Sequence, residues 1–180
     1  MEITIKYVAN YSLENVTTKK IADEMGISEG TIFNRFKNKS DLLINCLYYI
    51  DRKIDAAIGD SSIAILNISG SVKKLWYKYF AFLVEHSEYA KYYRQFRHSS
   101  YYTSDVIKGQ DESFSLFVKL IKKNLDLVGF NLDIFWVYVI ENTLNFAIRV
   151  ADGEIPKTKR NIERIYNLMA KGFIGNLTIK

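Results

Sequence analysis

Length and composition limit the classes of protein to which this chain can belong. The chain has 180 residues, of which 48% are hydrophobic and 25% are charged, and these proportions exclude a disordered or collagen-like protein. Its one cysteine, Cys46, excludes a disulfide framework and a multi-cysteine zinc site, and no apolar run reaches the roughly 18 residues of a membrane span. We therefore expect a globular protein in the reduced setting of the cytoplasm.

The charge of the chain is basic overall but balanced at its N-terminal end. The net charge is +5, which by itself invites a nucleic-acid partner. Residues 1–45, however, hold six basic and six acidic side chains, so the surplus comes from residues 46–180. The case for DNA binding must therefore rest on the local arrangement of residues.

The first 36 residues show the signals of three short helices. One proline and nine glycines in the whole chain leave long stretches without a helix breaker, which favours an all-α fold. Apolar spacing predicts a helix over residues 2–11. Thr17 or Thr18 caps a second helix that Gly26 ends, and Ser28 caps a third over residues 28–35. The second and third helices, over residues 17–36, form a predicted helix-turn-helix.

The rest of the chain reads as further helices. Asn38 with Asp41 starts a fourth helix that runs to about Ala57. A break follows, with Ile63, Ile65 and Leu66 still to be covered, before helices that begin at Ser71 and Ser87. Residues 99–109 read as a loop or frayed junction, and apolar spacing from Phe114 to Val128 marks another helix, stopped by Gly129. The last helices are expected over residues 132–151 and 157–174.

The predicted helix over residues 132–151 is apolar around most of its circumference. A helix with so little polar surface must be covered on two sides, by its own core and by a second surface such as another subunit. In total we expect about nine helices. They form an N-terminal helix-turn-helix domain over residues 1–45 and a larger helical domain over residues 46–180.

The segment from Thr17 to Leu43 resembles the DNA-binding segment of TetR-family transcriptional regulators. The residues that match the family pattern at the correct spacing are Thr17, Ile21, Ala22, Gly26, Ile27, Ser28, Gly30, Thr31, Ile32, Phe36, Lys39, Asp41, Leu42 and Leu43. Three positions depart from the pattern: Phe33 replaces a usual Tyr, Arg35 replaces a frequent His, and Ser12 replaces the usual Gly between the first two helices.

Each part of the motif has an expected task on double-stranded DNA. Thr17 and Thr18, at a helix N-terminus, are expected to meet a phosphate, and Lys39 is expected to anchor another phosphate. The third helix is expected to enter the major groove, where Gly30 permits close approach. Side chains predicted to reach base edges are Glu29, Thr31, Asn34 and Arg35. The full predicted DNA-binding set is Thr17, Thr18, Ser28, Glu29, Gly30, Thr31, Phe33, Asn34, Arg35 and Lys39.

The resemblance also implies a homodimeric repressor that binds a palindromic operator and is released by a small molecule. The larger domain would then bind a hydrophobic or aromatic effector and form the dimer. The predicted effector pocket comprises Trp76, Tyr79, Phe80, Phe117, Trp136, Tyr138, Glu141 and Asn142. The predicted dimer interface comprises Val137, Ile140, Leu144, Ile162, Ile165 and Met169. An ordinary aromatic core is the alternative for the first set.

Other functional classes fit the sequence less well. An enzyme is disfavoured because no nucleophile, metal or cofactor motif is present, and His86 and His98 are isolated. We therefore predict no cofactor and no membrane partner. A regulator controlled by protein partners, without a small-molecule response, stays open. Cys46 is expected to be a buried small apolar residue, and Tyr92, Tyr93, Tyr101 and Tyr102 suit either core or rim.

Overall fold

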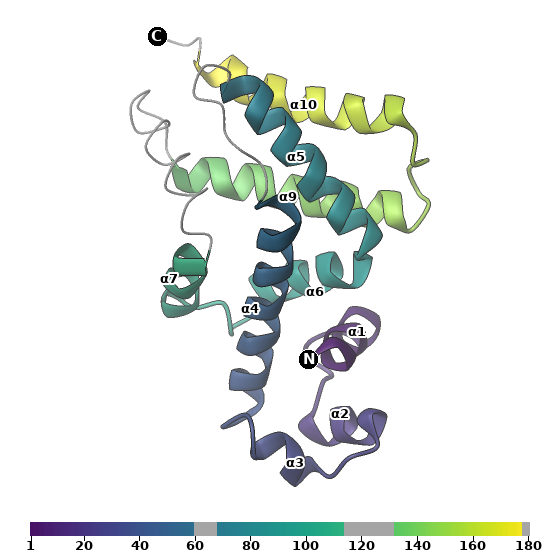
Figure 1. Cartoon of the computed structure of the whole chain (residues 1–180), viewed down its shortest axis with the longest axis vertical. Helices are drawn as coiled ribbons and strands as arrows, with labels where there is room; N and C mark the ends of the chain where they lie inside the picture. Colours follow the sequence, from purple (N-terminus) through teal and green to yellow (C-terminus); the bar gives the residue numbers. More distant parts are fainter. Residues whose placement is uncertain (60–67, 114–131, 178–180) are drawn as a thin grey trace. The chain divides into compact units, whose positions relative to one another are not determined.

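The computed structural model describes residues 1–59, 68–113 and 132–177. These residues form nine helices and no strand, which confirms the predicted all-α fold (Figure 1). The helices are α1 (Glu2–Tyr11), α2 (Thr18–Met25), α3 (Glu29–Phe33), α4 (Lys39–Ile58), α5 (Ile68–Glu85), α6 (Ser87–Arg97), α7 (Ser104–Ser113), α9 (Leu132–Ala151) and α10 (Lys159–Leu177).

The chain divides into two compact units. Unit 1 contains residues 1–55 and 88–113, and unit 2 contains residues 56–87 and 114–180. The predicted DNA-binding domain, residues 1–45, lies wholly in unit 1, but this unit also includes most of α6 and all of α7. The functional boundary at residue 45 stays a prediction. None of the described helices is both long and apolar enough to cross a membrane.

Unit 1 is organised around the apolar face of α4. The start of this helix is fixed by a capping arrangement, in which Asn38 Oδ1 accepts from the Asp41 backbone N–H at 2.9 Å and Asp41 Oδ2 accepts from Lys37 N–H at 2.8 Å. The side chains that fall on one face of the helix are buried, as their spacing predicts. They are Leu42, Leu43, Cys46, Leu47, Ile50 and Ile54.

Polar contacts fasten α1 and α6 to this core. The fully buried Tyr92 on α6 donates its hydroxyl to the Leu43 carbonyl at 2.7 Å. Glu2, at the start of α1, accepts hydrogen bonds from the hydroxyls of Tyr49 on α4 and Tyr89 on α6. These two hydrogen bonds lower the pKa of the Glu2 carboxyl, and the bond from Tyr49 has the larger effect. Burial raises the pKa of the Cys46 thiol to about 12, so this cysteine is an inert core residue, as predicted.

The turn after α1 holds a strained residue. Ser12 has φ 76° and ψ 149°, a conformation that side chains other than glycine rarely adopt. Asn15 braces this turn, because its Nδ2 donates to the Tyr11 carbonyl at 3.2 Å and to Ser12 Oγ at 3.1 Å. The turn therefore forms with serine at the position where the resembled family pattern carries glycine.

Unit 2 is built from α5, α9 and α10 in its described part. Both α5 and α10 pack against α9 (Figure 1). In the core, the Trp76 ring stacks on Phe80 with centroids 4.8 Å apart. The Trp76 indole N–H donates to Thr143 Oγ1 at 3.0 Å, which satisfies a buried polar group on α9.

The structure corrects part of the element prediction. Residues 104–113 form α7, although residues 99–109 read as a loop or frayed junction. The helix shows little apolar periodicity, and its Gly109 serves packing rather than a turn: a Cβ built there would lie 2.2 Å from Tyr48 Oη. Helix α5 begins three residues before the predicted Ser71. The predictions for residues 63–66 and 114–129 fall outside the described residues.

A buried polar cluster joins three helices of unit 1. Asp51 on α4 is fully buried, and Gln110 Nε2 on α7 lies 3.2 and 3.1 Å from its two carboxylate oxygens. The same nitrogen lies 2.6 Å from the Tyr93 hydroxyl on α6. Burial raises the pKa of Asp51 to about 7, although hydrogen bonds from Gln110 and Tyr93 and the charges of Arg52 and Arg97 act in the opposite direction.

We predict that this carboxyl makes the stability of the chain depend on pH. The folded protein keeps the Asp51 proton up to about pH 7, whereas the unfolded chain loses it near pH 4. The unfolding free energy should therefore fall as pH rises from about 4 to about 7, by at most about 1.4 kcal/mol per pH unit for this one proton. Asp51→Asn should remove this component, so that the variant gains stability relative to the wild type across the window.

Urea unfolding of both proteins at half-unit steps from pH 4.5 to 8 measures this difference. Asp55→Asn, which removes an exposed carboxyl from the same helix, is the matched control. Parallel stability curves for the wild type and Asp51→Asn would show that the prediction is wrong.

Candidate nucleic-acid interface

Helices α2 and α3 form the predicted helix-turn-helix. Thr17 caps α2 by accepting from the Lys20 N–H at 3.2 Å, and Gly26 ends it with φ 65°, the left-handed conformation that glycine adopts at low cost. The Ile27 N–H then donates to the Ala22 carbonyl at 3.0 Å, which closes the turn. Ser28 caps α3 by accepting from the Thr31 N–H at 3.2 Å.

The apolar residues of the motif leave one side of α3 exposed. Ile21, Ala22 and Ile32 are buried where the two helices meet. The outward side of α3 and the turn after it present exposed residues: Gly30, Thr31, Phe33, Asn34 and Arg35. The short helix continues as a tight turn, since the N–H groups of Arg35 and Phe36 both donate to the Ile32 carbonyl at 3.0 Å. The exposed face is thus held on a fixed backbone.

Two of the predicted DNA contacts are engaged with each other. Thr18 is buried, and its hydroxyl donates to the Glu29 carboxylate across the turn. Thr17, by contrast, is exposed at the cap of α2. The Thr18 and Glu29 side chains therefore tie α2 to α3, and a contact with a phosphate or a cytosine would have to replace this bond. Their predicted roles on DNA stay predictions.

Lys39 begins α4 and is half-buried beside a residue far away in the sequence. Its Nζ lies 5.9 Å from the centroid of the Tyr101 ring, in the connection between α6 and α7. The sequence left Tyr101 undecided between core and rim, and the structure makes Tyr101 and Tyr102 half-buried and Tyr92 and Tyr93 buried. No local spacing signal marks a pair so distant in the chain.

Comparison with known proteins agrees with this geometry. Residues 6–46 match the profile of bacterial regulatory proteins of the tetR family. An HTH-type transcriptional regulator of Staphylococcus aureus (strain USA300) is 42% identical over 57 residues, which cover 32% of this chain and 29% of the relative. Over its N-terminal residues the chain is therefore similar to TetR-family regulators. The match to this relative spans less than a third of its length.

The TetR fold extends over nearly the whole chain. A TetR-family transcription regulator from Marinobacter aquaeolei VT8 superposes with a TM-score of 0.80 at 19% identity, covering 93% of this chain and 90% of that one. A putative TetR-family regulator from Shewanella sp. PV-4 gives 0.79 at 15% identity, covering 93% and 92%. At these identities the likeness establishes the fold.

The residues of the predicted effector pocket differ in how deeply they are buried. Trp76 and Phe80 are buried and stacked, which is the aromatic-core alternative that the sequence left open for them. Tyr79, Tyr138, Glu141 and Asn142 are half-buried, and Asn142 donates to the Tyr138 carbonyl. Phe117 and the Trp136 side chain lie outside the described part. The pocket as a whole stays a prediction.

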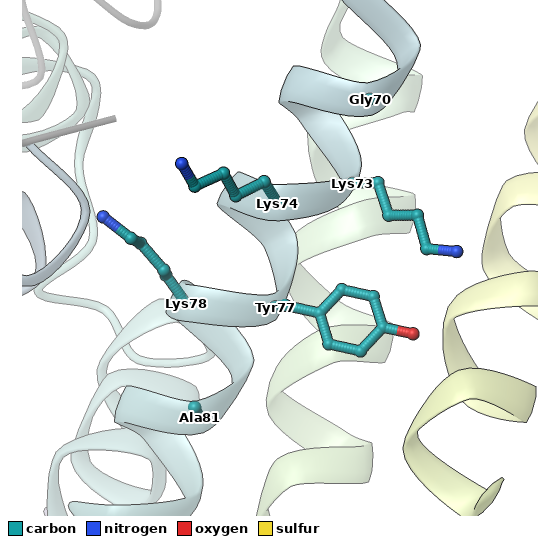
Figure 2. Close-up of a pocket in the computed structure, with 6 residues that line it drawn as sticks. All are labelled: Gly70, Lys73, Lys74, Tyr77, Lys78 and Ala81. Atoms are coloured by element: carbon teal, nitrogen blue, oxygen red, sulfur yellow. The ribbon is translucent and has the colours of Figure 1, made fainter. Parts of the chain in front are cut away.

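An open hollow of about 670 Å³ runs along α5 (Figure 2). It is lined by Gly70, Lys73, Lys74, Tyr77, Lys78 and Ala81. Figure 2 shows Lys73 and Tyr77 projecting toward α10 and the other two lysines projecting to the opposite side. On the α10 side, Lys73 Nζ lies 5.3 Å from the Tyr166 ring centroid. None of the predicted effector residues lines this hollow.

The predicted dimer residues are also divided. Leu144, Ile165 and Met169 are buried inside unit 2, so they fill its core. Val137 is 55% exposed. Two residues outside the predicted interface, Ile134 on α9 and Leu168 on α10, are 65% and 62% exposed. Ile140 and Ile162 are half-buried. The described residues contain no group of three or more His, Cys, Asp or Glu side chains that could hold a metal ion.

We predict that Gly30→Ala stabilises the fold but weakens DNA binding. Among the described residues, apart from its chain neighbours and its own helix backbone, an added Cβ would meet only Ser28 Oγ within 4 Å, at 3.7 Å, so the fold has room for the methyl group. Replacing glycine in a helix should raise the unfolding free energy by up to about 1 kcal/mol. The same methyl on the side proposed to face DNA should weaken binding about fivefold or more, since overpacking a close contact costs about 1–3 kcal/mol.

Urea unfolding and fluorescence anisotropy, on a duplex selected by the wild type from a random pool, test both parts. Gly26→Ala is the contrasting variant, because its positive φ should make alanine destabilising by about 1–2 kcal/mol even though nothing crowds the Cβ. Unchanged DNA affinity in Gly30→Ala would place α3 away from the groove.

Proposed function

We propose that the chain is a transcription regulator that binds a specific double-stranded DNA operator through α3. The observation that carries this proposal is the capped helix-turn-helix with an exposed outer face, in the segment that matches the tetR profile. A major groove about 12 Å wide accepts one helix, and amide and guanidinium groups such as those of Asn34 and Arg35 pair with adenine and guanine. Repression is the expected outcome of binding.

Binding to the DNA upstream of the chain's own gene tests the proposal. Fluorescence anisotropy against a scrambled duplex at two salt concentrations should show a preference of about a thousandfold or more. Asn34→Ala should lose affinity for the operator and relax base preference at one position. Lys39→Ala should weaken binding to all duplexes alike and reduce the salt slope by about one.

Each variant is the control for the other, because both side chains lie in unit 1. Only Asn34→Ala should change the sequence preference, whereas Lys39→Ala should change the affinity for all duplexes. Equal, weak and equally salt-sensitive binding to the operator, the scrambled duplex and a pool-selected duplex would reject sequence-specific regulation.

The proposed active form is a homodimer. Ile134 and Val137 on α9 and Leu168 on α10 each expose more than half of their surface, on two helices that pack together. A contiguous apolar patch of this kind is typical of a protein–protein interface. A two-fold partner would cover them and place two copies of α3 on a palindrome. This surface replaces the buried members of the interface that the sequence predicted.

We predict that Val137→Lys and Leu168→Lys each shift the dimer toward monomer in sedimentation equilibrium. The matched control is Ile107→Lys, which charges an exposed apolar residue of unit 1 (41% exposed) and should leave the association unchanged. A wild-type monomer at micromolar concentration, or dimers in both variants, would reject this interface.

The proposal includes release from DNA by a small molecule bound in unit 2. Lys73, which lies beside the rings of Tyr77 and Tyr166, favours an apolar compound with an acidic group. The alternative is a regulator that answers only to protein partners. Acidic aromatic and aliphatic compounds should raise the melting temperature and weaken operator binding; a panel without either effect would favour the alternative.

A further inference from the structure

Lys39 is proposed to contact a DNA phosphate, and its backbone is held in place by hydrogen bonds at the start of α4. It is the first residue of α4, and the Asn38 and Asp41 bonds hold the turn in which it lies. The lysine side chain, however, is a flexible four-carbon stem whose ordering on a phosphate costs rotamer entropy. Anything that confines the ammonium group before DNA arrives therefore improves the contact.

Tyr101 provides such a confinement from outside the helix-turn-helix. Its ring face lies 5.9 Å from Lys39 Nζ, within the range of a cation–π attraction. The contact joins the start of α4 to the connection between α6 and α7, and all of these residues belong to unit 1.

The ring itself is held firmly. It stacks on the fully buried Phe96, with centroids 6.4 Å apart and an interplanar angle of 29°. Its backbone N–H donates to Ser99 Oγ at 3.3 Å, and Ser99 Oγ donates to the Phe96 carbonyl at 2.7 Å. The next residue, Tyr102, accepts from Arg97 Nη1 at 2.8 Å. The connection is thus a preformed support rather than a loose loop.

A ring on one side leaves the other side of an ammonium group available. Lys39 has three N–H donors, and the electrostatic attraction to the π face leaves donors available for a phosphate oxygen. The ammonium can therefore rest on Tyr101 and donate to a phosphate at the same time. The aromatic face, and not the phenolic hydroxyl, supplies the attraction.

We propose that Tyr101 is a positioning residue for the phosphate contact of Lys39, so that the α6–α7 connection contributes to operator affinity without touching DNA. This inference rests on the proposed DNA-binding function. It adds a determinant of affinity that lies outside residues 1–45.

Operator binding by the full-length chain, measured by fluorescence anisotropy at several salt concentrations, tests the inference. Tyr101→Leu should lower affinity about two- to fivefold, the range of an exposed cation–π contact. Tyr101→Phe should keep the wild-type affinity because it keeps the ring. In a Lys39→Met background, Tyr101→Leu should cause no further loss, since the partner is already absent.

Two controls separate this effect from folding and from the proposed function. Lys53→Met removes the lysine from a comparable pair, with Nζ 5.3 Å from the Tyr49 ring centroid, and should leave affinity and salt slope unchanged. The ring-current shift of the Lys39 side-chain protons in NMR spectra, present in the wild type and Tyr101→Phe and lost in Tyr101→Leu, reports the contact without DNA.

The outcomes are distinct. An equal loss for Tyr101→Leu with and without Lys39, a loss in Tyr101→Phe as large as in Tyr101→Leu, or full affinity in Tyr101→Leu would each overturn the positioning role while leaving DNA binding intact. A wild-type protein that binds no duplex specifically would overturn the proposed function, and this inference with it.

Discussion

The buried face of α4 is the constraint on which unit 1 depends. Its apolar side chains lie against the rest of the unit, and the helices beside it are fastened by polar bonds: Tyr92 to the Leu43 carbonyl, Glu2 to Tyr49, and Gln110 to Asp51. The bonds of Tyr92 and Gln110 are buried, whereas that of Glu2 is exposed. Because hydrogen bonds need defined geometry, they fix where each helix lies along α4. The same helix begins with Lys39, so the core that orders the unit also places the charge that we propose contacts DNA.

The candidate interface depends on this core and on a few local interactions that fix α2 and α3. Caps at Thr17 and Ser28 and the left-handed Gly26 fix the two short helices, while Ile21 and Ile32 hold them together. A five-residue helix would not be stable alone in water, because nucleating a helix is unfavourable and so short a helix forms few backbone hydrogen bonds. Its exposed face is therefore available to a partner only because the opposite face is buried.

Signals close together in the sequence predicted most of the fold and the two helices of the candidate interface. Capping residues and glycine at Gly26 gave the bounds of α2 and α3 within one or two residues, and periodicity gave the buried face of α4. Helix α7 was missed because Gly109 resembles a turn signal although it permits a close approach to Tyr48. The Thr18–Glu29 bond and the Lys39–Tyr101 contact depend on three-dimensional proximity, which a single sequence does not encode locally.

The turn at Ser12 has a consequence for how this sequence can change over evolutionary time. Its positive φ is tolerated beside an Asn15 side chain that holds both Ser12 and Tyr11. A change of Asn15 made first removes the brace while the strained serine remains, whereas a change of Ser12 to glycine made first relieves the strain and makes the brace dispensable. The order of the two substitutions thus decides whether the path between them crosses a less stable intermediate, so each residue constrains which replacements at the other are accepted.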